Sequence, residues 1–131
     1  NIGGKLTLTA TGVLLRRVGK IETIVLTDLG KQDAAMDVIF FDSDPAATTF
    51  TDNVAQTIAD ADLTKICGVF KIVAADYSDL VDNSVACVRN IGIEFNLTAA
   101  QILYACLVSR GIPTYASASD LKLSVAVQQM I

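Results

Sequence analysis

The sequence predicts an all-β protein, an antiparallel β-sandwich of jelly-roll-like form with little helix. First, several segments alternate apolar and polar residues with a period of two, which is typical of strands buried on one face. Second, turn-forming Gly, Pro and clusters of Asp or Ser recur about every ten residues, a spacing found in sandwiches and barrels. Third, 12 of the 14 acidic residues are Asp. Asp favours turns, whereas Glu favours helices.

Three segments alternate most regularly, namely residues 5–11, 90–97 and 120–128. Each places an apolar side chain at every second position, with mostly polar residues or glycine between them. The residues predicted to face the core are Leu6, Leu8, Ala10, Ile91, Ile93, Phe95, Leu97, Leu121, Leu123, Val125 and Val127.

Other segments are apolar at consecutive positions, as in strands covered on both faces by a second sheet or by a partner. These are residues 22–28, 37–42 and 101–109. Residues 65–73 and 83–90 are predicted as two more strands, with Gly68 marking a bulge or a close approach. We expect helix only as one turn within residues 52–62 and another at residues 96–102, where Thr98 would be the N-cap.

We expect a single domain spanning residues 1–131, because no linker or repeat interrupts a chain of about one domain's length. The hydrophobic fraction is 52% and the mean hydropathy is +0.49. No apolar run approaches the ~20 residues of a membrane helix, and the start does not have the pattern of a signal peptide. We therefore expect the apolar surface to be buried against other protein, not in a membrane.

Charge and residue usage argue against several function classes. The net charge is −4 and only Arg16 and Arg17 are adjacent basic residues, so we expect no nucleic-acid binding. There is no histidine, the commonest general base and metal ligand. Cys67, Cys87 and Cys106 lie in apolar stretches without metal-binding or disulfide-framework spacing. Buried thiols and folding in a reducing cytoplasm are expected.

The stretch from Met36 to Asn53 holds four aspartates and is the strongest candidate for a catalytic or metal site. Asp42 and Asp44 are spaced as in some metal-binding loops, but the Gly and Glu of an EF-hand are missing. We interpret the stretch as a strand followed by a long polar loop, and leave open a weak calcium site at Asp42 and Asp44. Residues 60–65 are expected to form a solvated turn. Nucleophile, zinc-protease and phosphate-loop motifs are absent from the sequence, so we predict no enzyme activity, no cofactor and no metal.

Three stretches carry a family resemblance: GKIETIVLTDLGKQDAAMDVIFFDSDP, TIADADLTKICGV and LYACLVSRGIPTYASASDLKLSVAV. The chain from Gly19 onward resembles the capsid cement, or decoration, proteins of short-tailed bacteriophages. The resemblance implies a jelly-roll-like fold, a homodimer and attachment to the outside of an icosahedral head, with the major capsid protein as partner. The chain departs from the family between Arg17 and Lys20, where it is shorter than expected.

We therefore expect a structural virion protein that folds in the host cytoplasm and bridges capsid subunits from the capsid exterior. A carbohydrate- or receptor-binding β module of a phage virion is the alternative, although Trp is absent and aromatic residues make up only 6% of the chain. The start of the chain, Asn1 to Leu8, is a candidate for strand contacts with the capsid. The interface candidates of the central strands and the tail are Ile39, Phe41, Ile102, Tyr104, Leu107, Val125, Val127 and Ile131.

Overall fold

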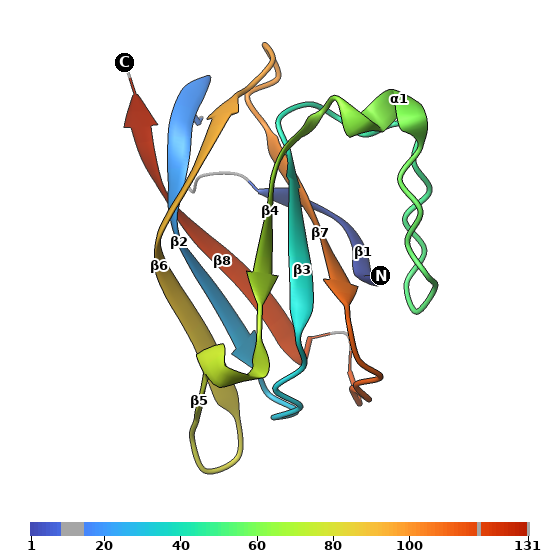
Figure 1. The fold of residues 1–131 in the computed structure, drawn as a ribbon, viewed down its shortest axis with the longest axis vertical. Coiled ribbons are helices and arrows are strands. Elements are labelled where there is room, and N and C mark those ends of the chain that lie inside the picture. The colour runs from blue at the N-terminus through green and yellow to red at the C-terminus, as the bar shows by residue number, and fades with distance from the viewer. Residues whose placement is uncertain (9–14, 118, 131) are drawn as a thin grey trace.

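The computed structural model describes residues 1–8, 15–117 and 119–130 (Figure 1). Within these ranges the chain forms eight strands, a one-turn α-helix and one 3-10 turn. The elements are β1 (Ile2–Leu8), β2 (Val18–Asp28), β3 (Met36–Phe41), α1 (Asp60–Leu63), β4 (Ile66–Ile72), η1 (Ala74–Asp76), β5 (Tyr77–Asp79), β6 (Ser84–Asn96), β7 (Leu103–Ser109) and β8 (Leu121–Met130).

The strands form two four-stranded sheets, with the orders β1-β7-β3-β4 and β5-β6-β2-β8. Neighbouring strands in both sheets are antiparallel. The predicted all-β antiparallel sandwich with little helix is confirmed, whereas its jelly-roll likeness remains a prediction. Because the strands run between two ends of the sandwich, the connections gather at those ends, as Figure 1 shows.

The core lies between the sheets and takes side chains from both. It includes Ile21 and Ile24 of β2 and Val38 and Phe40 of β3, none of which is exposed. The three alternating segments supply its margins as predicted, with Leu6, Leu123 and Phe95 and their alternate neighbours turned inward. Residues 9–11 of the first predicted strand lie outside the described residues.

Gly68 of β4 lies where the two sheets approach each other closely. A Cβ atom at this position would lie 2.7 Å from Cγ2 of Ile93 in β6, which is too near for any other residue without a shift. The register between β3 and β4 also shifts next to Gly68. Both roles predicted for this glycine, a bulge and a close approach, are therefore present.

Two local predictions were wrong. Residues 83–97 were expected as two strands, but β6 runs continuously through Asn90 and Gly92, whose positive φ angles of 59° and 70° accommodate a bulge. The helical turn predicted after Thr98 is a reverse turn instead, closed by a hydrogen bond from Gln101 N to Thr98 O at 2.9 Å. Between Arg17 and Lys20, where the chain is shorter than the family resemblance implies, it enters β2 directly at Val18.

Candidate interaction surface

The outer face of the first sheet carries a second, smaller core. Phe41 of β3 and Tyr104 and Cys106 of β7 pack together there and are 0–9% exposed. Ile39 and Ile102 are half-buried against them. Strands β3 and β7 are apolar on both faces, since one face packs in the main core and the other in the second core.

The cover is the chain's own loop between β3 and α1, residues 42–59. Phe50 and Ile58 from this loop pack on the second core, and the rings of Phe50 and Phe41 meet edge to face with centroids 6.1 Å apart. Leu107 lies in the main core. Of the predicted interface residues, Phe41, Tyr104 and Leu107 are therefore enclosed by the chain itself, and Ile131 lies outside the described residues.

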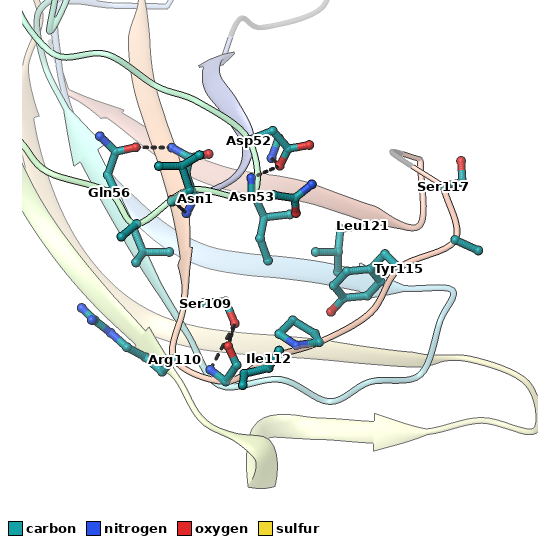
Figure 2. A pocket seen from close by; sticks show the side chains of 18 residues that line it. Asn1, Asp52, Asn53, Gln56, Ser109, Arg110, Ile112, Tyr115, Ser117 and Leu121 are labelled. Carbon is teal, nitrogen blue, oxygen red and sulfur yellow. Dashed lines mark hydrogen bonds between the residues drawn. The ribbon is translucent and has the colours of Figure 1, made fainter.

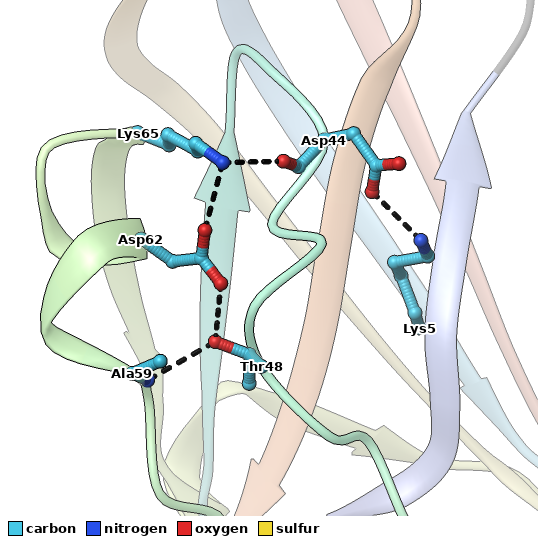
Figure 3. A network of polar contacts seen from close by, with 6 residues as sticks. All are labelled: Lys5, Asp44, Thr48, Ala59, Asp62 and Lys65. Atoms are coloured by element: carbon cyan, nitrogen blue, oxygen red, sulfur yellow. Dashed lines mark hydrogen bonds and ion pairs between the residues drawn. The ribbon is translucent and has the colours of Figure 1, made fainter.

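A buried carboxylate fastens this loop to α1 (Figure 3). Asp62 is 0% exposed; it accepts a hydrogen bond from Thr48 Oγ1 at 2.6 Å and pairs with Lys65 Nζ at 2.8 Å. The Thr48 hydroxyl in turn accepts a hydrogen bond from Ala59 N at 3.1 Å. The hydrogen bond from Lys65, followed by that from Thr48, lowers the pKa of Asp62. The prediction of a solvated turn at residues 60–65 was therefore wrong for Asp62.

Aspartates of the acidic stretch from Met36 to Asn53 also form ion pairs and hydrogen bonds within the chain. Asp44 pairs with Lys5 of β1 at 2.7 Å, and its backbone oxygen accepts a hydrogen bond from Lys65 Nζ at 2.8 Å. Asp37, 4% exposed, is paired with Arg110. In the described part of the chain, no group of three or more Cys, Asp or Glu side chains is placed to hold a metal ion. The predicted strand followed by a polar loop is what the stretch forms.

Strands β1 and β8 lie at the edges of their sheets. Within the described residues, β8 pairs only with β2, along its full length from Leu121 to Met130. Val125 and Val127 are half-buried against the main core. The strand contains one charged residue, Lys122, and no proline. Edge strands are usually protected by charges, prolines or coverage, so the outer edge of β8 is able to accept another strand.

Exposed apolar side chains concentrate at one end of the sandwich. We call this the hairpin end; it comprises the connections between β2 and β3, between β4 and β6, and between β7 and β8, all at the bottom of Figure 1. Of the nine large apolar side chains that are exposed in the described residues, five lie here. They are Leu29, Val73, Leu80, Val81 and Ile112.

The connections of the hairpin end are bonded to one another. Lys31 Nζ donates to Val81 O at 3.5 Å, which links the β2–β3 connection to the β5–β6 hairpin. Tyr77 Oη donates to Ala34 O at 2.8 Å between the same two segments. Leu29 N donates to the backbone oxygen of Asp120 at 2.8 Å. These contacts tie together the connections that carry the exposed side chains.

A row of polar residues crosses three strands at this end. Asp28 of β2 lies opposite Ser84 of β6, which lies opposite Asp79 of β5. Asp28 is 0% exposed, and its Oδ2 accepts hydrogen bonds from the backbone nitrogens of Gln32 and Asp33 at 2.9 and 3.1 Å.

The same corner has a surplus of acceptor oxygens. Three buried side-chain oxygens lack a hydrogen-bond partner among the residues that the structure describes, namely Asp28 Oδ1, Asp33 Oδ1 and Ser84 Oγ. Burial, followed by the charges of Asp28 and Asp33, raises the pKa of Tyr77 to about 12. The corner therefore brings several acidic and hydroxyl groups together.

The Asp33–Asp79 pair gives a testable pH dependence. A protonated Asp79 can donate a hydrogen bond to Asp33, and the Asp33 charge opposes ionisation, so the pKa of Asp79 is raised. A raised pKa in the folded state stabilises the fold fully below the unfolded value of about 3.9, and this contribution is lost as the pH rises through the folded value. Asp79→Asn is therefore expected to raise the Tm at pH 7 by about 1–2 °C, and to have no effect near pH 3.

Asp82→Asn is the matched control, because Asp82 is exposed in the same hairpin and the substitution removes the same charge. Thermal unfolding of both variants between pH 3 and pH 8 gives the comparison. Equal gains in Tm from the two variants would mean that net charge, not the Asp33–Asp79 contact, is responsible.

A pocket of about 570 Å³ lies beside the hairpin end, as Figure 2 shows. One wall comes from the start of β1 and the tip of loop 42–59, and the other from residues 108–117. Its polar side chains bond mainly to neighbours in the same wall: Asn1 Nδ2 donates to Gln56 Oε1 at 2.5 Å, and Asp52 Oδ1 accepts from Gly3 N at 2.9 Å. These groups are hydrogen-bonded to neighbouring residues of the chain.

The cysteines lie in different parts of the sandwich and have different exposures. Cys106 is buried, Cys67 is half-buried and Cys87 is exposed. Burial raises the pKa of Cys106 to about 11 and that of Cys67 to about 12. The two thiols are therefore protonated at neutral pH and weakly reactive. The prediction of burial was wrong for Cys87, which points outward from β6.

Among the helices of the described residues, none has the length and apolar character needed to span a membrane. The chain was compared with family models, with curated proteins and with solved structures, and it matched none of them.

Proposed function

We propose that the protein is a capsid cement, or decoration, protein. It binds the outside of an icosahedral phage head as a homodimer and bridges subunits of the major capsid protein. The observation that carries the proposal is the outer edge of β8, a ten-residue strand with one charge and no proline. Such an edge is suited to pairing with a strand of a neighbouring protein. The family resemblance of the sequence supports the same assignment.

The proposed mechanism is thermodynamic. A protein that binds only the assembled, expanded shell stabilises that state by mass action. When one subunit is already bound to one capsid protein, its contact with a second capsid protein is effectively intramolecular. The overall affinity therefore exceeds that of either contact alone. The bridged shell then resists the outward pressure of packaged DNA.

The proposal predicts saturable binding of the protein to expanded empty heads of the phage that encodes it. Co-sedimentation measures the binding, and the temperature of head disruption is expected to rise with bound protein. Ala126 is an exposed position of β8, the edge strand. Ala126→Lys places a long cationic side chain there, and this variant is expected to bind expanded heads about tenfold more weakly.

Ala61→Lys is the matched control, since it makes the same substitution at an exposed position of α1. It is expected to bind like the wild type. Failure of the wild-type protein to bind heads would contradict the proposed function. Binding to a glycan array without head binding would favour the carbohydrate-binding alternative.

A further inference from the structure

We propose that the hairpin end is a second docking surface, and that its occupant is a basic, partly apolar segment of the capsid subunit. This inference rests on the proposed function and names the chemistry of the partner. It gives the protein two contact sites, the edge of β8 and the hairpin end, as a bridge between capsid subunits requires.

Apolar exposure is the first step of the argument. Leu80 and Val81 form the turn of the β5–β6 hairpin and are 56% and 90% exposed. Leu29, in the neighbouring connection, is 56% exposed. The hydrogen bond from Lys31 Nζ to Val81 O joins the two segments. Exposed aliphatic side chains on neighbouring, hydrogen-bonded connections are typical of a protein-binding surface.

Charge is the second step and determines the kind of partner. The three connections of the hairpin end hold five aspartates and two basic residues, Lys31 and Arg110. Arg110 is already paired with Asp37. In the described part of the chain, neither Asp79 nor Asp82 forms an ion pair, and both are exposed.

The α1 end of the sandwich provides a contrast within the same molecule. There, Asp44 is paired with Lys5 and Asp62 with Lys65. Two aspartates of that end are thus compensated within the chain, whereas Asp42 and Asp60 form no ion pair with any residue that the structure describes. Among the described residues, none of the five aspartates in the hairpin-end connections forms an ion pair. A partner that neutralises the hairpin end must therefore carry Lys or Arg, and anionic lipids or nucleic acids are repelled.

Rigidity is the third step. The hairpin turn is closed by a hydrogen bond from Leu80 N to Asn83 O at 2.8 Å. Asp76 Oδ2 accepts a hydrogen bond from Val73 N at 2.9 Å and fixes the approach to β5. A surface that is already ordered loses little conformational entropy when a partner binds.

The test uses two variants at the hairpin end and two matched variants at the α1 end. Val81→Ser removes an exposed aliphatic side chain, and Leu63→Ser does the same on α1. Asp82→Lys reverses an exposed charge, and Asp60→Lys does so on α1. Binding of each full-length variant to expanded empty heads is measured by co-sedimentation at increasing NaCl, and circular dichroism verifies the fold.

Val81→Ser and Asp82→Lys are each expected to weaken head binding at least about tenfold, and the α1 variants less than about twofold. Wild-type binding is expected to fall with added salt, and Asp82→Lys to reduce that dependence. If the wild type binds heads and all four variants bind equally well, the docking surface is wrong and the proposed function stands. If the wild type does not bind heads, both are wrong.

Discussion

Replacing Phe41 with alanine is expected to reduce the free energy of unfolding by about 3–5 kcal/mol. Phe41 is 0% exposed, and Phe50 and Ile58 of loop 42–59 pack against the cluster that it forms with Tyr104 and Cys106. Removing its ring leaves a cavity and also takes away the aromatic partner of Phe50. Urea denaturation measures the loss of stability.

Loop 42–59 is expected to respond most strongly, because its apolar side chains Phe50 and Ile58 pack on the core that contains Phe41. Amide hydrogen exchange in Phe41→Ala should therefore accelerate in residues 48–59 more than in the β2–β6 pair. Phe40→Ala is the matched control, since Phe40 is equally buried but points between the two sheets. Phe40→Ala should reduce the free energy of unfolding by a similar amount, without selectively accelerating amide hydrogen exchange in the loop. Unchanged loop protection in Phe41→Ala would show that the second core does not hold the loop.

Strands with one buried face could be predicted from the sequence because alternation is a local pattern. Leu121, Leu123, Val125 and Val127 turn inward as their spacing indicates, and Lys122 turns outward. The abundance of Asp, which favours turns, also indicated a β fold with many turns. These signals depend only on residues that are near in the chain, and they were sufficient for the fold class.

The meaning of double-sided apolar strands could not be predicted in the same way. The pattern of Ile39 and Phe41 is the same whether a partner protein or the chain's own loop covers the outer face. A usable signal was present in the loop, where Phe50 and Ile58 are large apolar residues in a polar segment. Recognising it would have required knowing that the loop folds back over β3 and β7.

The hairpin end was missed for a different reason. Leu80, Val81 and Ile112 lie in connections, where isolated apolar residues carry no period that identifies a surface. Their grouping depends on the sandwich, which brings distant connections to one end. Asn90 was interpreted as the boundary between two strands, although it and Gly92 have positive φ angles within one strand, as a bulge requires.

Asp62→Asn is expected to lower the Tm at pH 7 by roughly 5 °C. The carboxylate of Asp62 accepts hydrogen bonds from Thr48 and Lys65, and an amide cannot pair with the Lys65 ammonium in the same way. Asp60→Asn, an exposed position in the same helix, is the control and is expected to leave the Tm nearly unchanged. Differential scanning calorimetry gives both values.

The pH dependence of Asp62→Asn follows from the lowered pKa of Asp62. A carboxyl whose pKa is lowered in the folded state stabilises the fold above the unfolded value of about 3.9, and this stabilisation is lost as the pH falls through the folded value. The Tm difference between wild type and variant should therefore be constant from pH 6 to pH 8 and shrink towards pH 2. Lys65→Met should be more damaging than Asp62→Asn, because it leaves a buried carboxylate without its cation. Combining the two substitutions should cost less than the sum of the single losses. Strict additivity would show that Asp62 and Lys65 act independently.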